Sequence, residues 1–152
     1  MRRAYRIVKR RLARFAFSGE GARLAGGRWN SPGARVVYLS STLSLAAMET
    51  FVHLGDDALA LDYVYFDVEI PANLPIEKLL HVPKGWREEP PTQTSMRSGD
   101  RWLRAGTSAL LEVPSAIVPS EKNILFNPSH PDAAKLRIAR ARAFHFDPRM
   151  WK

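Results

Sequence analysis

The segment from residue 62 to residue 70 constrains the fold of this chain more than any other stretch of the sequence. Its residues alternate between apolar and more polar side chains until Pro71 interrupts the pattern. Because successive side chains of a β-strand point to opposite faces, the alternation predicts a strand that is buried on one face. The apolar side consists of Val64, Phe66, Val68 and Ile70. We therefore expect a sheet that is covered on one face.

Strand and helix patterns follow one another irregularly along the rest of the chain. An apolar run over 35–40 predicts a buried strand, followed by a helix that begins after Ser41 or Thr42 and runs to about residue 54, with Gly55 as its stop. The other expected elements are strands over 5–8, 109–113, 116–118 and 136–146, a short helix up to Phe17, a helix over 94–104 stopped by Gly106, a glycine-rich loop over 19–33, a proline-rich loop over 83–91 and a polar turn over 127–131. This order predicts the α+β class: a single domain over 1–152 with a mixed, mostly antiparallel sheet and flanking helices.

The composition agrees with one soluble domain. The chain has 152 residues, of which 45% are hydrophobic, enough for one core. It contains no cysteine, which excludes disulfides, cysteine-ligated metals and a thiol nucleophile. No apolar run approaches the roughly 20 residues that cross a bilayer, and no apolar signal segment follows Met1. We therefore expect a cytoplasmic protein that does not enter a membrane.

Positive charge gathers at the two ends of the chain. The formal net charge is +8, with ten basic residues and one acidic residue over 1–35, whereas 36–134 is net negative. Such a distribution suits an anionic partner: nucleic acid, a phosphate-bearing ligand or an acidic protein surface. The sequence holds no zinc-finger spacing and no ribonucleoprotein motif. A basic nucleic-acid-binding module without catalysis stays as the alternative to an enzyme.

Glu49 and His53 are the two ionisable residues of the helix predicted after residue 41. Apolar residues occupy nearly every side of this helix, which is typical of an interior position. An ionised carboxylate there must be compensated, because its transfer out of water is costly. One explanation is a structural contact with His53, four residues later. The other is a carboxylate that faces a cleft and stabilises positive charge on a sugar carbon during glycosidic cleavage.

Arg28 stands in the sequence Gly26-Gly27-Arg28-Trp29-Asn30. Glycines let a ligand approach the backbone, and a guanidinium offers a planar fork for phosphate or carboxylate. This favours an anion site. The alternative is an exposed arginine in an ordinary surface turn, because the spacing matches neither a Walker loop nor a dinucleotide-binding fingerprint.

Two further polar residues stand out. Tyr38 ends a predicted buried strand, where its ring either belongs to the core or stacks on a heterocycle. Ser115 follows Pro114 without the Gly-x-Ser-x-Gly frame of a serine hydrolase, which favours a ligand contact or a simple turn over a nucleophile. The histidines, His53, His81, His130 and His145, lack metal-ligand spacing, so no metal site is expected.

Several fragments together resemble the RES domain family, which is named after its arginine, glutamate and serine. The central ones are Arg28 within Gly-Gly-Arg-Trp-Asn, Glu49 within Ala-Ala-Met-Glu-Thr and Ser115 within Val-Pro-Ser-Ala. The resemblance extends to Ala4-Tyr5-Arg6-Ile7, Val37-Tyr38-Leu39-Ser40-Ser41, Gly99-Asp100-Arg101-Trp102-Leu103, Asn123-Ile124-Leu125-Phe126-Asn127-Pro128 and His130-Pro131. Each fragment is weak alone, but their order and spacing cover nearly the whole chain.

The resemblance implies both an activity and a fold. RES proteins are toxins of bacterial type II toxin–antitoxin pairs, with a fold similar to ADP-ribosyltransferase toxins. They attack NAD⁺ and release nicotinamide, and different members pass the ADP-ribosyl group to phosphate, water or a protein. For this chain the resemblance implies NAD⁺ as a substrate, inorganic phosphate as a candidate second substrate and no resident cofactor. A protein ADP-ribosyltransferase is the alternative enzyme.

The resemblance also assigns roles to residues of this chain. Arg28 would hold a phosphate or ribose of NAD⁺, Tyr38 would pack the nicotinamide ring, and Glu49 would stabilise the ribosyl cation. The substrate pocket would further include Gly27, Trp29, Asn30, Ser115 and Asn127. The implied partner is a separate helix-turn-helix antitoxin of the Xre type whose tail blocks the active site. Nucleic acid would then be contacted indirectly, through the antitoxin.

Overall fold

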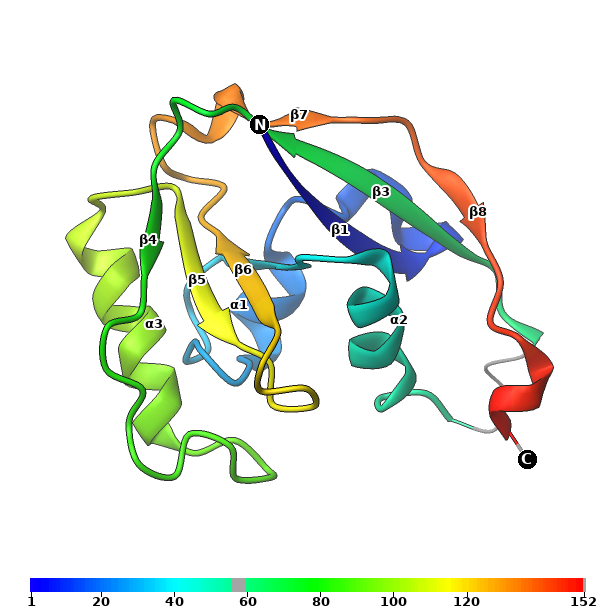
Figure 1. Ribbon diagram of the computed structural model, residues 1–152, viewed down its shortest axis with the longest axis horizontal. Coiled ribbons are helices and arrows are strands. Elements are labelled where there is room, and N and C mark those ends of the chain that lie inside the picture. The colour runs from blue at the N-terminus through cyan, green and yellow to red at the C-terminus, as the bar shows by residue number, and fades with distance from the viewer. Residues whose placement is uncertain (56–59, 152) are drawn as a thin grey trace.

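The computed structural model describes residues 1–55 and 60–151, and its centre is an eight-stranded sheet (Figure 1). The strands are β1 (Arg2–Lys9), β2 (Val37–Ser40), β3 (Tyr63–Ile70), β4 (Ile76–Lys78), β5 (Leu110–Pro114), β6 (Lys122–Phe126), β7 (Arg137–Ile138) and β8 (Arg142–Phe144). They lie in the order β4-β5-β6-β2-β1-β3-β7, with β8 also paired to β3. β4 and β5 are parallel, and the other pairs are antiparallel. The predicted α+β class with a mixed, mostly antiparallel sheet is confirmed.

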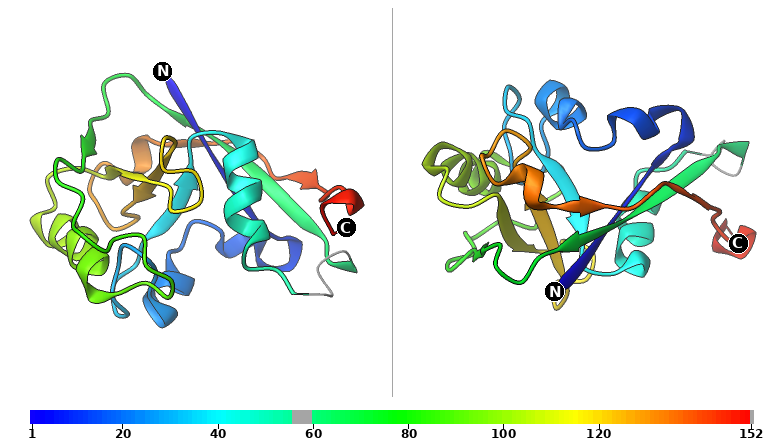
Figure 2. Two further views of the ribbon diagram at one scale, coloured as in Figure 1. Left: turned by 60° about the horizontal axis from the view of Figure 1, so that its bottom comes forward. Right: turned by 90° about the horizontal axis from the view of Figure 1, so that it is seen from above.

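Helices lie against both halves of this sheet (Figure 2). They are α1 (Glu20–Ala25), α2 (Leu43–Phe51), α3 (Gln93–Ala105) and the short 3-10 helices η1 (Arg10–Phe15), η3 (Ala133–Lys135) and η4 (Pro148–Trp151). Trp102 of α3 packs on Leu111 and Val113 of β5, whereas α2 packs against β1 and β2. In the described part of the chain, no helix has the length and apolar character of a membrane span.

The alternating segment forms β3 as predicted. Its four apolar residues are buried, and Tyr65, Asp67 and Glu69 between them are half-buried, whereas Tyr63 at the start of the strand is buried as well. β1 pairs with β3 over its whole length, from Arg2 opposite Ile70 to Lys9 opposite Tyr63. This long pair is the centre of one half of the sheet. Its register is fixed because a shift by one residue would turn the apolar side chains of β3 to the opposite face.

The sheet opens between β1 and β2. The pairing that the structure describes between these strands is limited to Tyr5 opposite Ser40, and the two halves of the sheet diverge from that point (Figure 1). The chain leaves β2 at Ser40 and enters α2 after Thr42, whose hydroxyl accepts the Leu45 N–H at 3.0 Å. The helix is therefore held at the point where the strands separate.

The prediction of an interior helix after residue 41 is wrong in two respects. α2 ends at Phe51, because the following N–H groups of His53 and Leu54 bond three residues back and tighten the chain before Gly55. The helix is also not interior: Met48 is 39% exposed and Val52, just after the helix, is 53% exposed. On this side of the segment Leu45 is buried in the core, whereas Met48 is exposed to solvent and Val52 lines a pocket.

Several other elements differ from the sequence-based expectation. The glycine-rich segment contains α1, since Gly19 and Gly26 flank this helix with φ of 74° each. Residues 116–118 form a bend instead of a strand, while β6 was not predicted. The long strand expected over 136–146 is divided into β7 and β8. Four steps separate Ile138 from Arg142, but their partners on β3 are three steps apart, so an extra residue interrupts the pairing.

Candidate active site

A pocket of about 1020 Å³ opens where β1 and β2 diverge. Its volume suits a ligand the size of a dinucleotide. Five predicted site residues line it, namely Gly27, Arg28, Trp29, Tyr38 and Glu49. The other three, Asn30, Ser115 and Asn127, are buried and not part of the lining. The structure therefore places Arg28, Tyr38 and Glu49 on one cavity, although they come from three different segments.

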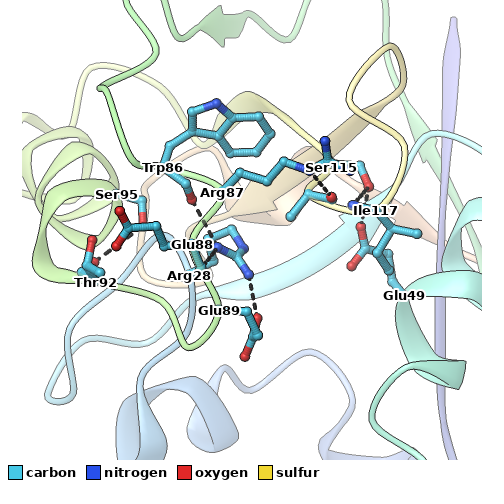
Figure 3. A network of polar contacts seen from close by, with 11 residues as sticks. Arg28, Glu49, Trp86, Arg87, Glu88, Glu89, Thr92, Ser95, Ser115 and Ile117 are labelled. Carbon is cyan, nitrogen blue, oxygen red and sulfur yellow. Dashed lines mark hydrogen bonds and ion pairs between the residues drawn. The ribbon is translucent and has the colours of Figure 1, made fainter.

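Glu49 is half-buried at the wall of this pocket, on the last turn of α2. Its Oε1 accepts the Ser115 hydroxyl at 2.7 Å (Figure 3). The same oxygen accepts the Asn123 side-chain amide, also at 2.7 Å. Oε2 has no hydrogen-bond partner within residues 1–55 and 60–151. The contact with His53, one of the two explanations considered for Glu49, is not formed, and within residues 1–55 and 60–151 Glu49 makes no ion pair. The carboxylate is therefore oriented by neutral donors through one oxygen, with the other available to a ligand.

Ser115 is fully buried and held by four hydrogen bonds. Its hydroxyl accepts the N–H groups of Ile117 and Val118, each at 3.1 Å, which turns the chain away from the sheet and explains why 116–118 is not a strand. Its own N–H bonds to the Glu121 carbonyl at 3.0 Å. With its acceptor capacity taken by these amides, the hydroxyl proton is directed to Glu49.

Asn123 was missed by the sequence analysis as a site residue. It lies on the unpredicted strand β6, opposite Ser40, and lines the pocket. Ser40 donates its hydroxyl to Asn123 Oδ1 at 2.8 Å, which leaves the amide hydrogens for Glu49. The signal was present, because Asn123 opens the fragment Asn-Ile-Leu-Phe-Asn-Pro that contributed to the family resemblance.

Arg28 lies at the tip of a tight turn in which Gly27 and Asn30 pair backbone to backbone. Its side chain is 15% exposed and is bound by the segment 86–89, whose labelled residues lie around Arg28 in Figure 3. One terminal nitrogen donates to the carbonyls of Trp86 at 2.9 Å and Glu88 at 2.7 Å. The other forms an ion pair with Glu89 at 2.7 Å. Arg28 is therefore not an ordinary exposed arginine.

Gly27 is required by the packing of Tyr38. A Cβ at Gly27 would lie 2.6 Å from the Tyr38 hydroxyl and 3.0 Å from Asn30 Oδ1. The space that the sequence analysis assigned to a ligand is thus occupied by a side chain of the protein. The Tyr38 hydroxyl donates to Asn30 Oδ1 at 2.5 Å and accepts the Trp29 N–H at 3.1 Å. Burial raises the pKa of Tyr38 well above the usual phenol range, so this side chain is a neutral wall of the pocket and not a base.

Trp29 fixes the position of the turn that carries Arg28. It is 2% exposed and stacks on Trp86, with ring centroids 5.9 Å apart. α3 packs so closely that a Cβ at Gly99 would lie 1.6 Å from the Trp29 carbonyl oxygen. The next residue, Asp100, accepts the Ser31 N–H at 2.9 Å. These contacts fix Arg28 relative to α3 and explain why Trp29 is mostly core.

Arg6 is a second cation of the pocket wall that the sequence analysis did not select. On β1, its guanidinium donates to the carbonyls of Ala16 at 2.6 Å and Tyr38 at 3.0 Å. Burial lowers the pKa of Arg6 to about 10, because desolvation disfavours the charged form. The side chain stays protonated near neutral pH and contributes positive charge beside Tyr38.

Asn127 lies away from this arrangement. Its side chain accepts the Ser129 N–H at 3.0 Å, and its own N–H bonds to the Ala109 carbonyl at 2.9 Å. These bonds stabilise the predicted polar turn over 127–131. A direct contact between Asn127 and a ligand in the pocket is not indicated by this position.

Comparison with known proteins agrees with this architecture. A toxin from Sphingobium sp. (strain YBL2) named "Prs ADP-ribosylating toxin" is 41% identical over 137 residues, covering 88% of this chain and 85% of that protein. "Toxin Res" from Yersinia enterocolitica is 39% identical over 148 residues, with 96% and 97% covered. "Toxin Res" from Photorhabdus laumondii is 37% identical over 150 residues, with 97% and 96% covered.

The fold is shared with a solved structure of low sequence similarity. The crystal structure of the M. tuberculosis MbcT–MbcA toxin–antitoxin complex matches with a TM-score of 0.75 at 16% identity, over 95% of this chain and 84% of that one. In sequence, the RES domain family matches residues 3–147 of this chain. Because this match spans nearly the whole chain and relatives of 37–41% identity cover it over most of their length, the chain belongs to the RES domain family.

Proposed function

We propose that this chain is the toxin of a toxin–antitoxin pair and that it cleaves the bond between nicotinamide and ribose in NAD⁺. The observation that carries the proposal is the orientation of Glu49 by Ser115 and Asn123 at the wall of a large pocket. Arg28 and Arg6 line the same pocket and provide positive charge for the pyrophosphate of a dinucleotide. The family membership and the names of the relatives support the same conclusion.

In the proposed reaction the bond from ribose C1′ to the pyridinium nitrogen breaks first. Its electron pair goes to that nitrogen, so nicotinamide leaves as a neutral molecule and positive charge develops on the ribose. The free Oε2 of Glu49 stabilises this charge, while the neutral donors Ser115 and Asn123 hold the carboxylate in place without adding charge of their own. An acceptor then bonds to C1′ and loses its proton.

The other site residues position the substrate in this proposal. Arg28 binds a phosphate of NAD⁺, and Tyr38 packs against the nicotinamide ring as a neutral phenol. Asn30 acts by accepting the Tyr38 hydroxyl, and Gly27 acts by leaving the room that this hydroxyl occupies. Trp29 fixes the turn that carries Arg28 through its stacking on Trp86.

The acceptor distinguishes two variants of the proposal. Water or inorganic phosphate as the acceptor would deplete NAD⁺, whereas a protein acceptor would be modified. The relative from Sphingobium, which is named for ADP-ribosylation of Prs, favours the protein acceptor as the second candidate. Both variants share the cleavage step at Glu49.

We further propose that a separate helix-turn-helix antitoxin of the Xre type binds this chain and closes the pocket with its tail. The structural relative was solved as a toxin–antitoxin complex, which supports a protein partner for this fold. A nucleic-acid-binding module without catalysis is less favoured, because it gives no role to the oriented carboxylate. That alternative predicts duplex DNA binding with a steep salt dependence.

Incubation of the purified chain with NAD⁺ tests the proposal. Nicotinamide released over time is measured by chromatography, in phosphate buffer and in a phosphate-free buffer, and the second product is identified by mass. Free ADP-ribose indicates water as the acceptor, and a phosphorylated ADP-ribose indicates phosphate. Absence of nicotinamide under all conditions, also with the candidate protein acceptor added, would reject the proposal.

A further inference from the structure

The segment 86–89, which we call the strap, supplies the three contacts that hold the Arg28 guanidinium. The carbonyls of Trp86 and Glu88 bind Nη1, and the carboxylate of Glu89 binds Nη2. The strap is also tied to the opposite wall, because Arg87 donates to the Ala116 carbonyl at 2.6 Å. It therefore spans the pocket from Arg28 to the turn that follows Ser115 (Figure 3).

The three contacts on Arg28 differ in kind. Two are neutral carbonyls of the backbone, which fix the direction of the guanidinium and carry no net charge. The third is a carboxylate, which is the type of group that competes with phosphate for the fork of an arginine. Glu89 lines the pocket together with Arg28, whereas Glu88 does not.

Glu89 is also the contact that can leave most easily. Its side chain is 70% exposed, and its ion pair with Arg28 is the one interaction that it makes with the described residues. Exposed ion pairs are weak because water and salt screen them. After Glu89 departs, the bonds to Trp86 and Glu88 still hold Arg28 in its position.

We infer that the Glu89 carboxylate is a built-in competitor at Arg28 that the phosphate of an anionic substrate must displace, so that Glu89 sets the affinity of the pocket. This inference rests on the proposed binding of NAD⁺ in the pocket. It assigns Glu89 a role in specificity: a ligand without an anionic group gains nothing from Arg28, because it leaves the Glu89 ion pair intact.

Binding of NAD⁺ by calorimetry tests this inference. Glu89→Gln removes the charge but keeps the size of the side chain, and Glu89→Ala removes the contact. Both are made in chains that also carry Glu49→Gln, so that the substrate is not consumed. Relative to the chain that carries Glu49→Gln alone, we expect the Kd for NAD⁺ to fall about two- to fivefold in both variants, which corresponds to the free energy of an exposed ion pair. Glu88→Gln is the matched control, since it removes the same charge one residue earlier and leaves the Arg28 contacts in place.

The outcomes separate the inference from the proposed function. With Glu49 intact, the KM for NAD⁺ should fall in Glu89→Gln with kcat little changed. An unchanged or weaker affinity in the Glu89 variants, or an equal gain in Glu88→Gln, overturns the inference while NAD⁺ still binds. If NAD⁺ neither binds nor is cleaved in any variant, the proposed function fails, and the inference fails with it.

Discussion

Ser115 donates its hydroxyl to Oε1 of Glu49 at 2.7 Å and thereby joins two residues that are 66 positions apart in the sequence. The serine is fully buried, and the glutamate lies at the wall of the pocket. In this relationship the serine is a positioning residue, because the backbone amides of the following turn already occupy its acceptor sites.

Ser115→Ala should lower kcat for nicotinamide release while leaving the KM for NAD⁺ nearly unchanged. The carboxylate loses one of its two donors, and the N–H groups of Ile117 and Val118 lose their acceptor. Because these amides belong to half-buried residues, the loss of their acceptor should reduce the free energy of unfolding by about 0.5–1.5 kcal/mol. Ser44→Ala, at an exposed position of α2, is the matched control. An unchanged kcat in a folded Ser115→Ala chain would contradict the positioning role.

Gly27→Ala should destabilise the fold and impair the site, because the new methyl group would meet the Tyr38 hydroxyl. Either Tyr38 or the turn that carries Arg28 must shift. Gly21→Ala is the matched control: its Cβ meets nothing within 4 Å, and alanine within a helix gains about 0.5–1 kcal/mol over glycine. Urea unfolding should therefore show a lower free energy of unfolding for Gly27→Ala and an equal or higher one for Gly21→Ala. NAD⁺ cleavage should be impaired more in Gly27→Ala than in Gly21→Ala. Equal behaviour would show that Gly27 is not needed for packing.

Arg28→Lys should raise the KM for NAD⁺ by about tenfold or more, although the charge is retained. A lysine lacks the planar fork and does not reach the strap carbonyls and an anion at once. Steady-state kinetics measure the change. Arg97→Lys, on the exposed side of α3, controls for the substitution itself and should leave KM unchanged. A KM close to that of the intact chain would remove Arg28 from the anion site.

The raised pKa of Tyr38 makes a prediction for alkaline stability. The unfolded chain releases this phenol proton above pH of about 10, while the folded chain keeps it, so stability is lost as pH rises. The loss reaches at most about 1.4 kcal/mol per pH unit for one group. Tyr38→Phe lacks this contribution. Urea unfolding at pH 9 and pH 11 should therefore show a larger decrease for the intact chain than for Tyr38→Phe, and parallel decreases would argue against a buried phenol.

The elements that the sequence predicted best are those with a strong local pattern. β3 has strict alternation, and α3 ends at Ala105, directly before Gly106, whose φ of 62° suits glycine. The elements that were missed depend on individual side-chain contacts and on tertiary structure, which leave no periodic pattern in the sequence. The bend at 116–118 depends on the Ser115 hydroxyl, and the exposure of α2 depends on a pocket that exists once β1 and β2 diverge.

The sequence predicted which charged residues belong to the candidate site better than it predicted their burial and their neighbours. Glu49 and Arg28 were selected because a carboxylate among apolar residues and an arginine directly after two glycines are unusual. Glu49 proved to be half-buried beside a pocket instead of interior, since α2 lies at the surface. Asn123 and Arg6 were missed because each is a single polar residue in a strand, and no local pattern shows that it faces Glu49 or Tyr38.

Glu49→Gln tests the central claim most directly, because it keeps the size of the side chain and its place beside Ser115 while removing the charge. Nicotinamide release from NAD⁺ is measured for the intact chain and for the variant, with circular dichroism and urea unfolding to verify that both are folded. We predict that the intact chain releases nicotinamide and that the variant is slower by about a hundredfold or more, because the charge that stabilises the ribosyl cation is gone. Equal rates in the two folded proteins would contradict the account.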